Sequence, residues 1–104
     1  MTACQKTVIT GTGSYLPEKI KTNKDLEKVV DTNDEWIQHR TGITERRIAC
    51  EDETASQMGA AAALKALEKA GIKGDQIDGI IVGTSTPDTT FPAVAIHIQS
   101  AVGS

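Results

Sequence analysis

The chain is poor in aromatic residues, cysteine and proline, and these shortages exclude several kinds of protein and site. Its 104 residues include one tryptophan, one tyrosine, one phenylalanine, two cysteines and three prolines. Cys4 and Cys50 form no CxxC motif and have no histidine at ligand spacing, so they predict free thiols rather than a zinc site or a disulfide framework. With so few rings, the core must be built from Val, Ile, Leu and Ala.

Long apolar runs and an excess of positive charge are also missing. No run approaches the length of a membrane span, and the first residues lack the apolar stretch of a signal peptide. We therefore expect a cytoplasmic protein that does not cross a membrane. The formal net charge of −3 argues against a general nucleic-acid binder. The length suits one small domain or a piece of a larger one.

Signals for helix starts and stops are frequent. Thr54 and Gln57 form a capping box, and Gly71 follows apolar residues at helical spacing, which predicts a helix to about Ala70. Its many alanines favour close packing between layers. Similar signals predict a short helix that Thr22 or Asn23 caps and that runs through Val30, a helix around Trp36 that starts at a Thr32/Glu35 capping box and stops before Gly42, and a helix over 93–102 with Pro92 at its first position.

Two segments rich in β-branched residues flank the long helix. Residues 6–10 and 77–83 predict strands, and strand, helix and apolar strand in that order predict a parallel βαβ unit of an α/β protein. Gly11 and Gly13 end the first strand. We interpret them as a tight turn, because Leu16 breaks the GxGxxG pattern of a dinucleotide site. Shorter extended pieces are expected around Ile20 and within 43–49.

The segment around Trp36 carries the best candidate site. Arg40 follows the only tryptophan by four residues, which places both side chains on one face of a helix. Indole and guanidinium would then be two flat walls for an electron-rich ring, and arginine also binds phosphate. A ligand with a purine and phosphates fits both properties. The alternative is a partly buried packing tryptophan, over which the arginine lays its apolar stem.

Other residues with reactive or ligating side chains predict no reaction centre. The acidic groups at 34–35 and 51–53 precede or begin helices, so the helix dipole explains them without a metal. His39 and His97 have no nearby ligand partner and are interpreted as a surface and a helix-face residue. The acidic neighbours of Cys50 disfavour its thiolate. No Ser-His-Asp or Cys-His arrangement can be assembled, so no catalytic residue is predicted.

Several blocks of the sequence resemble β-ketoacyl-acyl-carrier-protein synthase III, a family of condensing enzymes that initiates bacterial type II fatty-acid synthesis. The resemblance covers essentially the whole chain without gaps. Its most specific part is the Asp-Glu-Trp-Ile and Arg-Thr-Gly-Ile block. The matching blocks are Gly11–Pro17, Thr22–Asn23, Asp31–Thr32, Asp34–Ile37, Arg40–Ile43, Glu45–Arg46, Glu53–Thr54, Met58–Gly59, Ala70–Ile72, Phe91–Pro92 and Ile98–Ser100.

This resemblance implies a fold and a function. The family has a thiolase-like αβαβα layered sandwich of two similar halves, and residues 1–104 correspond to an incomplete N-terminal part of the first half. The family's residues at the positions of Thr32, Trp36 and Arg40 bind the adenine of coenzyme A. The one at Phe91 reaches across a homodimer and shapes the partner's acyl pocket. Arg46 matches a family arginine to which we assign no role.

The reaction implied joins acetyl-CoA and malonyl-acyl-carrier protein to give acetoacetyl-carrier protein, CoA and CO₂. A cysteine takes the acetyl group, while a histidine and an asparagine stabilise developing charge. All three match positions beyond Ser104, so we expect this chain alone to be inactive. Acetyl-CoA and acyl carrier protein are the expected substrate and partner, with no prosthetic group or metal.

Two other functions remain open. The chain could be a stand-alone module that binds CoA or a nucleotide, although sheet edges left exposed argue against a stable fold of that kind. It could also be a non-enzymatic protein that pairs with a full-length synthase through the surface near Phe91. Phe91 is bulky and hints at a short acyl primer, but one residue does not decide primer preference.

Overall fold

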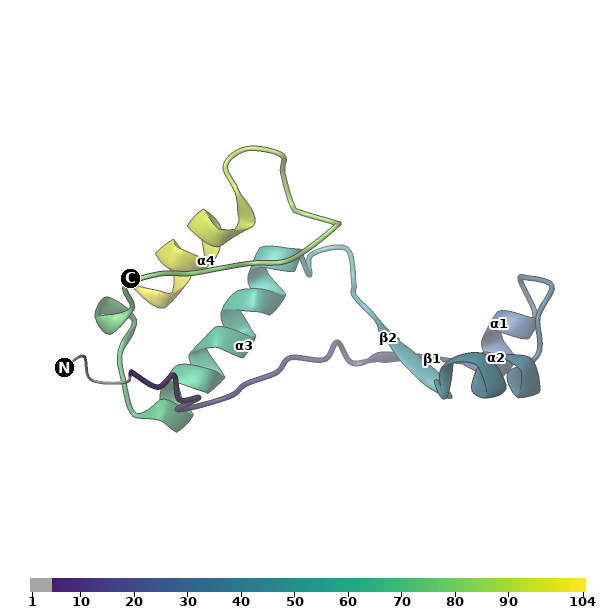
Figure 1. Ribbon diagram of the computed structural model, residues 1–104. Helices are drawn as coiled ribbons and strands as arrows, with labels where there is room; N and C mark the ends of the chain where they lie inside the picture. Colours follow the sequence, from purple (N-terminus) through teal and green to yellow (C-terminus); the bar gives the residue numbers. More distant parts are fainter. Residues whose placement is uncertain (1–4) are drawn as a thin grey trace. The chain divides into compact units, whose positions relative to one another are not determined.

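The computed structural model describes residues 5–104, so Cys4 and the prediction of a free thiol there lie outside it. The described chain forms two compact units. The hairpin unit is Leu16–Glu53, and the helical unit combines residues 5–15 with Thr54–Ser104. Figure 1 shows β1, β2, α1 and α2 in the hairpin unit, and α3 and α4 in the helical unit.

The hairpin unit is built on a two-stranded antiparallel sheet. β1 (Lys19–Thr22) pairs with β2 (Glu45–Ile48). Arg47 extends the contact beyond the ladder, because its Nη1 donates to the carbonyl oxygen of Pro17 at 2.8 Å. The short extended pieces expected around Ile20 and within 43–49 are therefore confirmed.

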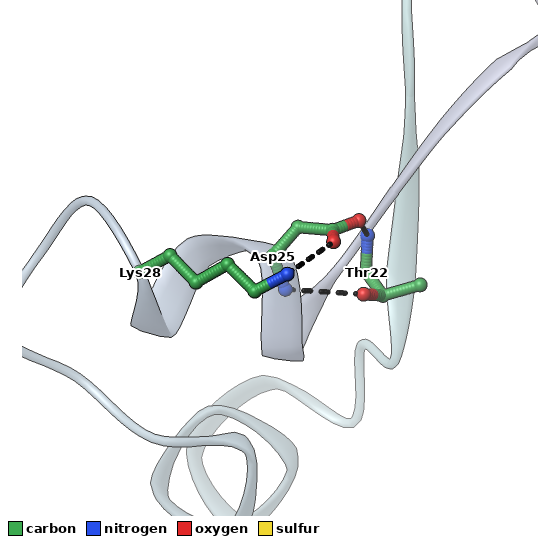
Figure 2. Close-up of polar contacts among 3 residues, drawn as sticks. All are labelled: Thr22, Asp25 and Lys28. Carbon is green, nitrogen blue, oxygen red and sulfur yellow. Dashed lines mark hydrogen bonds and ion pairs between the residues drawn. The ribbon is translucent and has the colours of Figure 1, made fainter.

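Helix α1 (Asn23–Glu27) begins with a capping box, and Figure 2 shows it. Thr22 Oγ1 accepts from the Asp25 amide at 3.2 Å, and the Asp25 carboxylate accepts from the Thr22 amide at 2.9 Å. Lys28 Nζ lies 4.0 Å from the same carboxylate. The predicted continuation through Val30 is wrong, because β-branched valines lose side-chain freedom in a helix and the chain turns instead.

Helix α2 (Asp34–Thr41) confirms the helix expected around Trp36, but its start differs from the prediction. Asn33, and not Thr32, is the N-cap, and its Oδ1 accepts from the Trp36 amide at 2.7 Å. Asparagine is at least as good a cap as threonine, which accounts for the shift of one residue. Gly42 ends the helix with φ 72°, as a left-handed C-terminal glycine.

Helix α3 (Ala55–Ala70) confirms the second capping box and the stop at Gly71. Thr54 Oγ1 accepts from the Gln57 amide at 3.3 Å, and Gln57 Oε1 accepts from the Thr54 amide at 3.0 Å. Two orphan amides at the start of α3 are thereby satisfied.

The segment before β1 lies directly on α3, which corrects the interpretation of its glycines as a turn. A Cβ at Gly11 would come within 2.5 Å of the Ala66 carbonyl oxygen, and one at Gly13 would clash with the carbonyl oxygen of Ala62. Both glycines have negative φ, so close approach and not backbone conformation requires them. The alanines of α3 allow this approach, as the sequence predicts.

Helix α4 (Val94–Val102) packs against α3. Ile98 is buried, and a Cβ at Gly59 would meet its Cδ1 at 2.7 Å. The sequence predicts Pro92 at the first helical position, which is wrong, because Ala93 is the N-cap and Pro92 lies in a bend before it. The end of the helix at Val102 is as predicted.

The two strands expected on either side of α3 are not formed within residues 5–104. Residues 6–10 and 77–83 are extended but belong to no sheet, and the 3-10 helix η1 (Gly74–Gln76) precedes the second segment. The predicted βαβ pairing is therefore wrong for the described residues. High β-propensity makes a strand only where a second strand completes its hydrogen bonds. No helix among residues 5–104 is long and apolar enough to cross a membrane.

Candidate functional site

Trp36 and Arg40 lie together on the exposed face of α2. The Arg40 Cζ atom stands 5.5 Å from the centre of the indole ring, within the range of a cation–π contact. Trp36 keeps 54% of its surface exposed, whereas Ile37 on the other face is buried. The i, i+4 spacing therefore produces the pair that the sequence predicts. A half-exposed indole with the arginine over it also fits the alternative of a partly buried packing tryptophan, so the ligand site stays a prediction.

The distance from Arg40 Cζ to the centre of the Trp36 ring limits what the pair can hold in this arrangement. Stacked carbon atoms lie about 3.5 Å apart, so a flat ring between two walls needs a separation of about 7 Å. The observed 5.5 Å is too short for an inserted ring. Arg40 is exposed, and its long side chain can swing away without disturbing the helix. In the observed arrangement the pair therefore holds no ring, and a ring could enter only after Arg40 moves.

Thr32 is next to this pair in sequence but does not face open solvent. Its Oγ1 atom is buried and has no hydrogen-bond partner in the described structure. A buried hydroxyl without a partner is costly, which makes it a candidate to bond a ligand after a small rearrangement. The assignment of Thr32 to adenine binding stays a prediction.

Side-chain hydrogen bonds fix the start of α2, and only some of them can be read from sequence spacing. The Asp34 amide donates to Glu27 Oε1 at 2.7 Å. Hydrogen bonds from Gln38 and then from Asn23 lower the pKa of Asp34 below its ordinary value of 3.8. Gln38 follows by one helical turn and could have been read from the sequence, whereas the long-range partner Asn23 looked like a helix cap only.

Phe91 belongs to the helical unit, where its side chain is 89% exposed in the loop before α4. Asp88 ties this loop to the start of α3. The Ser56 amide donates to Asp88 Oδ1 at 2.9 Å and the Ser56 hydroxyl to Oδ2, and these bonds lower the pKa of Asp88. His97 is half-buried on α4, with a buried Nε2 that has no partner within the described chain. Sequence reasoning missed the Ser56–Asp88 contact.

Cys50 and His39 are two residues of the hairpin unit with reactive side chains. Cys50 is exposed, and its Sγ donates to Asp52 Oδ1 at 3.0 Å. That bond, with help from Glu53, raises the pKa of the Cys50 thiol from 9.0 to about 11, in line with the sequence-based argument. His39 is exposed on α2. No group of three or more His, Cys, Asp or Glu residues in this range could hold a metal ion.

Comparison with known proteins gives one consistent class of relatives. No family model matches the chain. It is 56% identical over 95 residues to a β-ketoacyl-[acyl-carrier-protein] synthase III of Xanthomonas campestris pv. campestris (strain 8004), covering 91% of this chain and 29% of that protein. It is 58% identical over 97 residues to the synthase III of Escherichia coli O9:H4 (strain HS), covering 93% and 31%. A crystal structure of 3-oxoacyl-[acyl-carrier-protein] synthase III from Aquifex aeolicus VF5 superposes with a TM-score of 0.85 at 50% identity, covering 91% of this chain and 30% of that one.

These matches define first a class and then a family. The fold is the α/β fold of the thiolase-like condensing enzymes, and the described residues form part of it. Within this class, the matched residues of the chain are similar to proteins of the β-ketoacyl-[acyl-carrier-protein] synthase III family, which confirms the resemblance stated above. The chain spans about 30% of the length of these relatives.

Proposed function

We propose that this chain is part of an initiating condensing enzyme of type II fatty-acid synthesis and supplies its adenine-binding surface for coenzyme A. The enzyme is an acyltransferase that joins acetyl-CoA and malonyl-acyl-carrier protein to give acetoacetyl-carrier protein, CoA and CO₂. The observation that carries the proposal is the exposed Trp36 ring with the Arg40 guanidinium 5.5 Å above it. Similarity to proteins of the synthase III family supports it independently.

In this proposal Trp36 and Arg40 open to hold adenine between them. The indole contributes a large flat apolar face, and the guanidinium stacks on the other side while its N–H groups are free to meet phosphate. Thr32 would bond the adenine end through its now unpartnered hydroxyl. All three residues belong to the hairpin unit, and two of them are on one short helix.

The remaining assignments follow from the family. Acyl carrier protein is the macromolecular partner, the enzyme is a cytoplasmic homodimer, and acetyl-CoA is a substrate rather than a bound prosthetic group. Phe91, exposed before α4, would line the acyl pocket of the second subunit. We assign no catalytic role to the described cysteine or histidines, and we expect the chain alone to transfer no acetyl group.

A binding experiment tests the adenine site. Replacing Trp36 with alanine should weaken CoA binding by about 1–3 kcal/mol, the range found when aromatic rings that stack on bases are removed. Trp36→Phe keeps a smaller ring, so its affinity for CoA should lie between those of the unaltered protein and of Trp36→Ala. Calorimetric titration with CoA measures the dissociation constants. Equal values for all three proteins would contradict the site.

The separate hairpin unit favours a second candidate, a stand-alone module that binds CoA or a nucleotide. Its capped helices and its sheet make their contacts within residues 16–53. A monomeric chain that unfolds cooperatively and binds CoA at micromolar concentration would support this candidate. A chain that folds only in a longer protein would support the condensing enzyme. The third candidate, a non-enzymatic partner of a full-length synthase, would be supported if it co-purified with one through the Phe91 surface.

A further inference from the structure

Asn23 is the most completely buried side chain among the described residues, and every polar atom of its amide is used. It is 1% exposed. Its Nδ2 donates to Asp34 Oδ1 at 2.7 Å and to the Ile43 carbonyl oxygen at 2.8 Å, and its Oδ1 accepts from Arg46 Nη2 at 2.7 Å. Its backbone amide donates to the Thr44 carbonyl oxygen at 3.1 Å.

These contacts reach both ends of α2 from one amide nitrogen. Asp34 is the first residue of the helix, and Ile43 follows the glycine that ends it. The Asn23 oxygen meanwhile binds Arg46 of β2, whose Nη1 donates to the Lys21 carbonyl oxygen of β1 at 3.2 Å. The amide therefore connects α2 to the sheet.

Apolar packing alone holds α2 weakly. The helix has eight residues, of which only Ile37 is buried. Helices shorter than about 12 residues are marginal in water without tertiary contacts. Trp36 and Arg40 project from the exposed face, so the orientation of both depends on how the two ends of the helix are held.

We propose that Asn23 is a positioning residue that sets Trp36 and Arg40 for adenine binding, with Asp34 and Arg46 as its partners. This inference rests on the proposed function of the Trp36 and Arg40 pair. Asn23 acts through the helix and does not touch the ligand. From the sequence, Thr22 and Asn23 are both candidate caps of the short helix. In the structure Thr22 alone is the cap, so capping does not explain Asn23.

A charge swap tests the contact without removing side-chain volume. Asn23→Asp keeps the acceptor for Arg46 but places a carboxylate against Asp34 and against the Ile43 carbonyl oxygen. In the double variant Asn23→Asp, Asp34→Asn, a donor again faces an acceptor across that contact. Asn33→Asp is the matched control, because it makes the same chemical change at the start of α2 and keeps the acceptor for the Trp36 amide.

Two readouts separate positioning from folding. Calorimetric titration with adenosine 3′,5′-bisphosphate gives the affinity at a temperature where each variant is fully folded, and thermal unfolding gives the midpoint. We expect Asn23→Asp to weaken binding about tenfold at that temperature, which corresponds to the loss of about one hydrogen bond to a charged group. The double variant should recover part of this loss, because it restores the contact with residue 34 but leaves a carboxylate against the Ile43 carbonyl oxygen. Asn33→Asp should stay within about twofold of the unaltered protein.

Each outcome is informative. If Asn23→Asp lowers the midpoint but binds as tightly as the unaltered protein, Asn23 is a stability residue only, and the proposal is overturned. If it does not fold, Asp34→Ala, which removes the oxygen that accepts from Asn23 Nδ2, must weaken binding in the folded state, and unchanged affinity would equally overturn the proposal. If the unaltered protein does not bind the probe, the proposed function itself fails, and the positioning role of Asn23 fails with it.

Discussion

The two units hold themselves together by different means. In the hairpin unit, one buried amide and a set of side-chain hydrogen bonds join two strands and two short helices, with Ile37 as the buried apolar side chain. In the helical unit, glycine and alanine bring backbones into direct contact, and the buried residues Ala60, Val94 and Ile98 lie between α3 and α4. Hydrogen bonds between buried polar groups fix the arrangement of the hairpin unit, whereas close backbone packing holds the helical unit together.

The helical unit also leaves apolar surface uncovered. A cavity of about 330 Å³ lies between the two extended segments, α3 and α4, and its lining is mainly Ile, Leu, Val and Ala. Val8, Ile9 and Ile81 on the extended segments are exposed. The hairpin unit instead has the fully buried Asn23 amide at its centre, so the two units should respond differently to changes in packing.

The largest effect is expected from a methyl group between the first extended segment and α3. Gly13→Ala would place its Cβ against the Ala62 carbonyl oxygen and 2.6 Å from the Ala66 amide nitrogen. Because backbone cannot move aside cheaply, we expect a loss of about 3 kcal/mol in the free energy of unfolding, at the upper end for overpacking. Gly79→Ala is the control, since nothing lies within 4 Å of its Cβ. Chemical denaturation measures both, and equal stability of the two variants would contradict the packing described.

A smaller loss of stability should come from removing a helix cap. Each cap variant should affect only the unit in which it lies. Thr54→Ala removes the capping hydroxyl of α3, and Thr22→Ala removes that of α1. Each change should cost about 1 kcal/mol. Amide hydrogen exchange should speed up in α3 for the first variant and in the hairpin unit for the second. If both variants accelerate exchange in both units alike, the division into two units is wrong in solution.

The smallest change is a local one, at the Cys50 thiol. Because its pKa is raised from 9.0 to about 11, the thiolate is scarce at pH 8 despite exposure of the side chain. We expect alkylation by iodoacetamide at pH 8 to be at least about tenfold slower than that of free cysteine, and to accelerate as the pH rises toward 11. Asp52→Asn removes the carboxylate that holds the proton and should raise the rate. A rate equal to that of free cysteine would show that the hydrogen bond does not persist.

Features that depend on residues close together in the chain could be predicted from the sequence. The start and end of α3 follow from Thr54, Gln57 and Gly71, whose roles depend only on residues within one or two turns. The Trp36 and Arg40 pair follows for the same reason. Helix and strand patterns predicted only an α/β protein. The thiolase-like fold came from the resemblance to a family.

Long-range contacts explain what the sequence does not predict. Residues 6–10 and 77–83 have the composition of strands, but a strand depends on a partner that no local pattern supplies. The role of Gly11 and Gly13 depends on α3, about 50 residues later in the chain. Asn23 meets Asp34, Ile43 and Arg46 only in the folded hairpin unit, so its spacing to any of them carries no signal.

The most direct test of the account is a crystal structure of the protein with CoA or adenosine 3′,5′-bisphosphate. We expect adenine to lie between the two side chains, with the distance from Arg40 Cζ to the centre of the Trp36 ring widened from 5.5 Å to about 7 Å. A ligand bound elsewhere, with the pair still closed at its present separation, would contradict the proposed site.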